Sequence, residues 1–139
     1  MEHQIYSSIE INASPKKVWE ILLDTQNYSQ WNPFITKLEG QFQSGGKLEV
    51  ELGGMNFKPT VKIFETTRHF AWLGHFLIKG IFDGEHHFEI IPNSSGTSTF
   101  KHHEKFNGIL VGLMKKKLDT EILSQFKAMN EALKTQAEK

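Results

Sequence analysis

Residues 9–31 read IEINASPKKVWEILLDTQNYSQW and combine the end of a strand with the start of a helix. In the strand, isoleucine or serine alternates with polar residues at the period of two that is typical of a half-buried strand: Ile5, Ser7, Ile9 and Ile11. Ser14 and Pro15 then form a helix start, because a serine hydroxyl caps the first turn and proline is tolerated at its first position. We therefore predict a strand over 5–11 and a short helix ending near Asp24.

After this helix, Asn27 to Trp31 predicts one more short helical turn, which Asn32-Pro33 ends because the residue before a proline disfavours helical dihedrals. From Ile35 to Phe106 the pattern has a period of two, which predicts six strands in a meander. The turns between them are marked by Gly45-Gly46, Gly53-Gly54, Gly80 and Pro92-Asn93.

Folding two of these hairpins assigns the faces of the strands. A turn at Gly53-Gly54 places Val50 opposite Phe57 and gives that hairpin an apolar face. A turn about Asn93–Ser95 places His86 opposite His102, and pairing 70–76 with 82–88 places Gly74 opposite Gly84. The inner face of the last hairpin then comprises Phe82, Gly84, His86, Phe88 and Ile90 with Ser98, Phe100, His102, Glu104 and Phe106. On the outer face, His87 and His103 are expected in solvent beside Lys101 and Glu85.

After Gly108 the period changes to that of a helix. The apolar residues are Leu110, Met114, Leu118, Ile122, Phe126, Met129 and Leu133. The opposite, polar face comprises Lys116, Asp119, Lys127, Asn130, Glu131 and Lys134. One long amphipathic helix must bury its apolar stripe on the inner face of the sheet, so the fold class is α+β, with helices on one side of an antiparallel sheet.

The length, net charge and composition of the chain exclude several classes of function. A chain of 139 residues fits one domain, 1–139, and its formal net charge of zero disfavours general nucleic-acid binding. With no cysteine, disulfides, thiolate nucleophiles and cysteine-ligated zinc are excluded. Neither a membrane span nor a signal peptide is apparent, so we expect a cytoplasmic protein without stable membrane insertion.

The segment 9–31 with Asn32-Pro33-Phe34, the stretch FDGEHHFEIIP at 82–92 and Gly96-Thr97 resemble the START-like or SRPBCC superfamily, nearest its polyketide cyclase and dehydrase group. This resemblance covers nearly the whole chain. It implies the helix-grip fold, a seven-stranded curved antiparallel sheet wrapped around a long C-terminal helix, with a cavity for a hydrophobic ligand. Phe106-Asn107-Gly108-Ile109 departs from the glycine-tryptophan pair of members that resemble activators of heat-shock ATPases, which argues against a co-chaperone role.

Three polar residues, His86, His102 and Glu104, lie on an inner face that is otherwise apolar. Buried polar groups need hydrogen-bond partners, so a satisfied polar cluster in the core is one interpretation. A second is that these groups orient a ligand in an apolar pocket, and a third is a metal or acid–base site. Because the spacing matches no metal motif, no metal and no cofactor are expected.

We expect a pocket between the sheet and the C-terminal helix. Gly74 and Gly84 either leave a hollow in it or relieve strand curvature. The candidate ligand-binding residues are Phe57, Trp72, Gly84, His86, Phe88, Phe100, His102, Glu104 and Met114. At the expected mouth, residues 109–117 read ILVGLMKKK, which predicts either buried first turns of the helix with solvated lysines or a gate that touches a membrane.

Two functions follow from this pocket. The first is binding of a small hydrophobic or amphipathic molecule, lipid-like or polyketide-like, which needs only apolar walls and a few polar groups. The alternative is a cyclase- or dehydratase-like enzyme in which His86 or His102 acts as a base and Glu104 as an acid or as the group that orients the histidine. A protein-interaction domain is a third class, for which no dedicated exposed apolar stripe is apparent.

Overall fold

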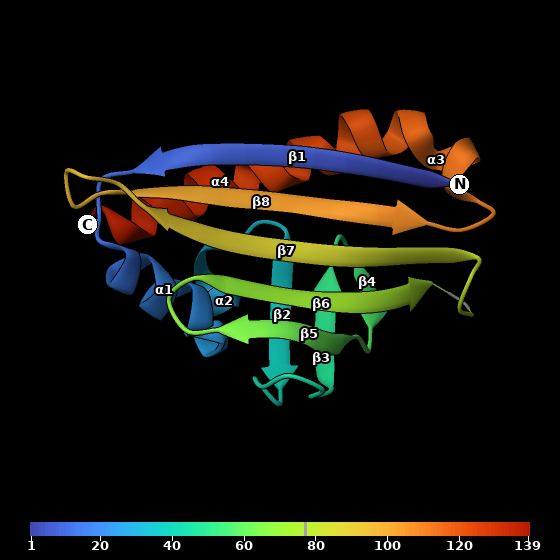
Figure 1. Cartoon of the computed structure of the whole chain (residues 1–139), viewed down its shortest axis with the longest axis horizontal. Helices are drawn as coiled ribbons and strands as arrows, with labels where there is room; N and C mark the ends of the chain where they lie inside the picture. Colours follow the sequence, from blue (N-terminus) through green and yellow to red (C-terminus); the bar gives the residue numbers. More distant parts are fainter. Residues whose placement is uncertain (77) are drawn as a thin grey trace.

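An antiparallel sheet covers one side of a long C-terminal helix (Figure 1). The computed structural model describes residues 1–76 and 78–139. The elements up to residue 76 are β1 (Glu2–Ile11), α1 (Pro15–Leu23), η1 (Thr25–Asn27), α2 (Tyr28–Trp31), β2 (Ile35–Gly40), β3 (Leu48–Leu52), β4 (Met55–Phe57), β5 (Thr60–Glu65) and β6 (His69–Phe76). They are followed by β7 (Phe82–Pro92), β8 (Ser98–Asn107), α3 (Val111–Lys117), the π-helical turn η2 (Leu118–Ile122) and α4 (Leu123–Ala137).

The first helices form as the sequence predicts. Ser14 caps α1, its side chain accepting a hydrogen bond from the backbone N–H of Lys17 at 3.2 Å, and Pro15 is the first helical residue. The buried side chain of Asn32 follows α2 and accepts hydrogen bonds from the backbone N–H groups of Phe34 and Ile35. These bonds turn the chain from α2 into β2.

The α+β arrangement is confirmed, but the strands are more finely divided than predicted. The described residues contain eight strands, in a five-stranded sheet of order β1-β8-β7-β6-β5 and a three-stranded sheet of order β2-β3-β4. The stretch after the Gly53-Gly54 turn forms two strands, β4 and β5, because Pro59 between them has no N–H to continue the ladder. Backbone hydrogen bonds from Leu48 to Pro59 and from Val61 to Gly46 still join the two sheets.

Two predicted registers are confirmed and one is wrong. Val50 pairs with Phe57 at the Gly53-Gly54 turn, and Gly74 pairs with Gly84. In the last hairpin, however, His86 pairs with Glu104 and not with His102. The loop is longer than predicted, since the Asn93 backbone N–H donates to the Thr97 carbonyl and Gly96 takes a left-handed φ of +84°. The partner shifts by two residues, so every side chain keeps its predicted face.

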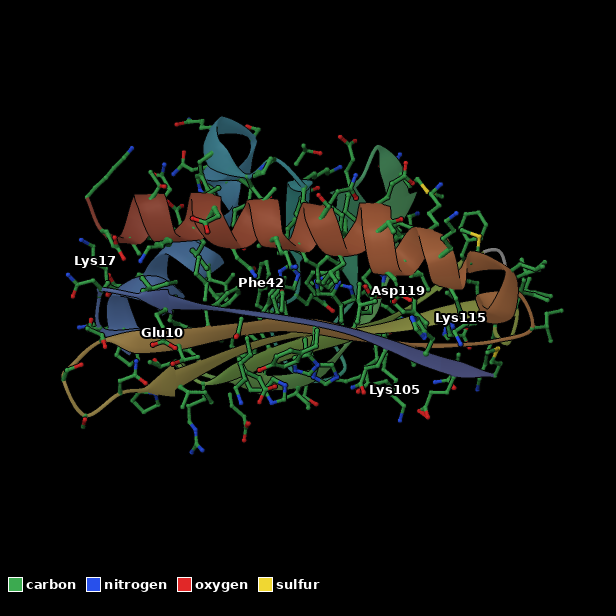
Figure 2. All side chains as sticks on the ribbon, turned by 90° about the horizontal axis from the view of Figure 1, so that it is seen from above. Glu10, Lys17, Phe42, Lys105, Lys115 and Asp119 are labelled. Atoms are coloured by element: carbon green, nitrogen blue, oxygen red, sulfur yellow. The ribbon has the colours of Figure 1, made fainter. Side chains whose placement is uncertain are left out.

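The C-terminal helix lies along the inner face of the five-stranded sheet (Figures 1 and 2). Its α4 part buries Phe126, Met129 and Leu133 fully. The predicted polar face is corrected at Asn130, which is only 2% exposed and points into the core. Within the described residues, no helix has the length and apolar character needed to cross a membrane.

Candidate ligand site

A cavity of about 430 Å³ lies between the inner face of the sheet and the first part of the C-terminal helix. Most of its wall is apolar. The apolar side chains lining it are Phe34, Leu52, Met55, Phe57, Pro59, Trp72, Phe76, Phe82, Phe106, Leu110, Met114, Leu118 and Ile122. The polar ones are Glu104, Lys117, Glu121 and Gln125.

The cavity exists at one end of the helix because the other end is packed solidly. Phe126 of α4 stacks on the His102 ring with centroids 4.0 Å apart and planes 7° from parallel, and Phe34 packs against Phe126 at 5.4 Å. One turn earlier, Ile122 and Leu118 of η2 no longer fill the space and line the cavity instead. The open space therefore begins at the first turn of α4, where Gln125 lines it, and continues along η2.

The nine predicted site residues divide into two groups. Five of them line the cavity: Phe57, Trp72, Gly84, Glu104 and Met114. The other four do not line it and are 0–1% exposed in the core: His86, Phe88, Phe100 and His102. They are sealed because Phe34 and Phe126 cover the two histidine rings, an arrangement that strand periodicity does not reveal.

The two facing glycines have different effects. A Cβ on Gly74 would meet only Pro59 at an ordinary 3.7 Å, so this position leaves space. A Cβ on Gly84 would overlap the Glu104 carboxyl group, so Gly84 does not leave the predicted hollow. Its missing side chain makes room for the Glu104 carboxyl group, which it positions at the cavity wall.

A chain of buried polar side chains leads inward from the cavity wall, and we call it the polar chain: Glu104, His86, His102, Asn130 and Ser7. Glu104 Oε1 lies 3.1 Å from His86 Nδ1. The Nε2 atoms of His86 and His102 are 2.8 Å apart, and His102 Nδ1 lies 2.9 Å from Asn130 Oδ1. Every link is within hydrogen-bond distance, so the predicted satisfied cluster and the cavity meet at Glu104.

The directions of these hydrogen bonds place the protons. The Ser7 hydroxyl donates to the His102 carbonyl, so the Asn130 amide donates to Ser7 Oγ and its oxygen accepts from His102 Nδ1–H. His102 Nε2 is then the acceptor for His86 Nε2–H. A neutral His86 leaves Nδ1 as an acceptor, and a protonated Glu104 carboxyl group, whose Oε1 lies 3.1 Å away, is a suitable donor to it.

Burial also favours the neutral forms of His86, His102 and Glu104. It lowers the pKa of His86 to about 3, with His87 and His103 adding to the effect, and holds the pKa of His102 well below its ordinary value. Burial also raises the pKa of Glu104 to about 8. Burial therefore favours a neutral carboxylic acid at the cavity wall near pH 7.

Three polar residues of the wall were missed by sequence analysis: Lys117, Glu121 and Gln125. Lys117 Nζ lies 3.7 Å from Glu121 Oε2. The buried Oε1 of Gln125 has no hydrogen-bond partner among the described residues, so it is available to a donor on a bound molecule. Their recurrence at every fourth position, next to Leu118 and Ile122, was a usable signal because residues four apart share one face of a helix.

The outer face differs from the expectation for His87 and His103. Their rings are half-buried and stack with centroids 4.7 Å apart and planes 4° from parallel. His87 Nε2 lies 2.8 Å from Glu85 Oε1, and its Nδ1 lies 2.8 Å from Nε2 of His69. Across residues 1–76 and 78–139, no three histidine or acidic side chains are arranged to hold a metal ion.

Comparison with known proteins points to one family and one fold. Residues 2–138 match the family described as polyketide cyclase / dehydrase and lipid transport. No functionally curated protein matches the chain. A hypothetical protein of Helicobacter pylori, jhp0584, superposes with a TM-score of 0.83 at 15% identity, over 97% of this chain and 88% of that one. A START superfamily protein of Mycobacterium smegmatis gives 0.70 at 22% identity, over 96% and 99%.

A two-domain aromatase/cyclase (ARO/CYC), BexL from the BE-7585A biosynthetic pathway, shares the fold as well. It superposes with a TM-score of 0.77 at 11% identity, over 99% of this chain and 50% of that one. The chain thus corresponds to about half of BexL. At these identities the likenesses establish the fold.

Proposed function

The chain belongs to the polyketide cyclase / dehydrase and lipid transport family, and on this premise we propose that it binds a small hydrophobic or amphipathic molecule between the sheet and the C-terminal helix. The observation that carries the proposal is the cavity. Its volume of about 430 Å³ and its mostly apolar wall are those of an ordinary ligand site.

The polar groups of the wall specify the chemistry of the ligand. The protonated Glu104 carboxyl group offers a donor and an acceptor at the wall nearest the sheet, and its side chain is 14% exposed. Gln125 Oε1 offers an unused acceptor from the helix. We propose a ligand with an apolar body and a hydroxyl or carbonyl group, because such a group can hydrogen-bond to a neutral acid without meeting a buried charge.

The proposed contact residues are those predicted residues that line the cavity: Phe57, Trp72, Gly84, Glu104 and Met114. Trp72 stacks on His86 with centroids 4.8 Å apart, so its ring is fixed before any ligand arrives. A rigid aromatic wall on one side and the flexible Met114 on the other suit a flat or branched apolar body.

The test is to titrate the purified protein with an environment-sensitive naphthalene dye and then displace the dye with palmitate or a planar aromatic phenol. Met114→Trp should fill the cavity and weaken dye binding at least tenfold, since it occupies the volume that the ligand needs. Leu113→Trp is the matched control, because Leu113 is the neighbouring residue and is 83% exposed. A wild type that binds no probe, or equal binding by Met114→Trp, would refute the proposal.

One contact supports the enzyme alternative as a second candidate. Glu104 lines the cavity and lies 3.1 Å from His86 Nδ1, which makes it a candidate general acid for a cyclase- or dehydratase-like reaction. His102 lies behind Phe126 and His86 is buried, so of these three groups Glu104 alone lines the cavity. Turnover of a synthetic poly-β-carbonyl thioester that Glu104→Gln abolishes without weakening binding would support this candidate.

A further inference from the structure

Three large aliphatic side chains point into solvent at one end of the molecule. Ile78 is 68% exposed, Ile109 is 74% exposed and Leu113 is 83% exposed, and we call these three residues the apolar tip. Scattered exposed apolar residues are normal, but grouped ones mark interaction sites. The grouping is the observation to be explained.

Backbone hydrogen bonds hold the apolar tip together. The Ile109 N–H donates to the Gly80 carbonyl at 3.2 Å, and the Leu110 N–H donates to the Ile81 carbonyl at 3.0 Å. The connection between β6 and β7 is thereby tied to the start of α3, and Figure 1 shows both at the end of the sheet where the N-terminus lies. Ile109 lies in the turn just before α3, and Leu113 lies in the first turn of α3.

Lysines surround the apolar tip. Lys79 adjoins Ile78, and Lys115 and Lys116 follow Leu113, all three exposed. Among the described residues, no carboxylate lies within 4.0 Å of their ammonium groups. Figure 2 shows Lys115 at the end of the molecule where α3 lies.

Three acidic groups on η2 and at the start of β7 have lysine or histidine partners. Asp119 Oδ1 lies 2.6 Å from His3 Nε2, and Glu121 Oε2 lies 3.7 Å from Lys117 Nζ. Asp83 Oδ1 lies 2.7 Å from His75 Nδ1. The apolar tip is therefore flanked by three exposed lysines without a carboxylate partner among the described residues, and a negative surface is complementary to them.

We propose that the apolar tip docks this protein reversibly on a bilayer that contains anionic lipids. A stable protein interface uses about 20–30 residues on each side, far more than three protruding aliphatic side chains provide. A bilayer interface accepts such side chains one by one, and anionic headgroups attract the flanking lysines.

Docking in this way turns the cavity toward the bilayer. Leu110 and Met114 line the cavity and lie next to Ile109 and Leu113 in the sequence. Phe76, which is 36% exposed, lines the cavity from the neighbouring strand end. The docking itself depends on surface residues and does not require a bound ligand.

The experiment is flotation of the ligand-free full chain with phosphatidylcholine vesicles, with and without 30 mole per cent phosphatidylglycerol. We expect binding to the anionic vesicles only, weakening as salt rises. Lys115→Gln/Lys116→Gln should weaken it about 25-fold, since each lysine near an anionic surface contributes about fivefold. Ile109→Ser/Leu113→Ser should weaken it at least tenfold.

Matched controls lie away from the apolar tip. Ile91→Ser changes an aliphatic residue that is 38% exposed at the opposite end of β7, and Lys16→Gln/Lys127→Gln removes two other exposed lysines. Both should bind as the wild type does, and thermal unfolding checks that every variant is folded. Equal binding to neutral vesicles, insensitivity to the tip variants, or a dimer that Leu113→Ser dissociates would each overturn the proposal, the last by identifying a second copy as the occupant.

Discussion

The Nε2 atoms of His86 and His102 lie 2.8 Å apart in the core, although these residues are not partners in the strand pair. His102 is opposite Phe88, whose ring centroid is 4.9 Å from that of His102. The two imidazoles therefore meet diagonally across β7 and β8, and each uses Nε2 for the other. Their remaining nitrogens connect to Glu104 on the cavity side and to Asn130 on the helix.

This connection makes Asn130 a structural residue. Asn130→Ala should lower the free energy of unfolding by about 2–3 kcal/mol, because it leaves His102 Nδ1–H without an acceptor and Ser7 Oγ without a donor. The neighbouring exposed Glu131→Ala should cost less than about 0.5 kcal/mol. Urea unfolding followed by circular dichroism measures both, and equal costs would contradict the buried chain of hydrogen bonds.

Glu104 should make stability fall with rising pH between about 6.5 and 8. The folded protein keeps the Glu104 proton up to a pKa of about 8, whereas an ordinary glutamate loses it near 4.5, so unfolding releases a proton in this range. The slope should stay below about 1.4 kcal/mol per pH unit, because the side chain keeps some solvent contact. The lowered pKa values of His86 and His102 have the opposite effect, because they make stability rise with pH, and they do so at lower pH.

Glu104→Gln isolates this effect. The amide can still donate to His86 Nδ1 but does not titrate, so the variant should lose less stability than the wild type between pH 6.5 and 8. Denaturant unfolding at both pH values gives the comparison. Parallel curves for the two proteins would show that Glu104 is already ionised at pH 6.5.

Phe88→Ala should cost about 3–5 kcal/mol, because the ring is fully buried between Trp72 and Phe100 and its removal opens a void. Glu89 faces outward, where its carboxylate pairs with His103. Glu89→Ala should therefore cost less than about 1 kcal/mol. Similar losses in the two variants would contradict the assignment of the inner face.

Purified protein should contain no stoichiometric zinc or iron. His86 and His102 each have both ring nitrogens within hydrogen-bond distance of another protein group, so neither offers a free lone pair to a metal. Elemental analysis checks this. About one equivalent of metal, lost in His86→Ala/His102→Ala, would instead support the metal-dependent interpretation of this cluster.

The period-two pattern of the sequence was sufficient to predict which strand residues face the core. Alternation placed Phe88 and Phe100 inside, and the pairing of Gly74 with Gly84 followed from matching two apolar runs. To predict the register of the last hairpin, one needs the length of its loop. Hydrogen bonds from Asn93 to Thr97 set that length. Such loop geometry is set by side-chain contacts that no periodic pattern encodes.

The candidate site was predictable only in part, for a physical reason. Inner-face position identified Glu104 and Trp72, but it could not distinguish a residue beside the cavity from one beneath the helix. His102 is shielded from the cavity because Phe126 packs on it. This is a contact between segments far apart in the sequence. Asn130 was misplaced because one polar residue in a helix pattern does not reveal a buried partner.

The π-helical turn at Leu118–Ile122 sets the rotational phase between the two halves of the helix. A π turn accommodates one extra residue, and each residue of an α-helix advances the rotation by about 100°. The half that carries Met114 is thus aimed independently of the half that carries Phe126. An unbroken α-helix over the same residues would rotate Met114 by about 100° relative to Phe126 and turn it away from the cavity, whereas deleting one residue such as Thr120 would remove the π turn and leave both side chains on their present faces. The π turn therefore lets one helix both line the cavity with Met114 and pack Phe126 on His102.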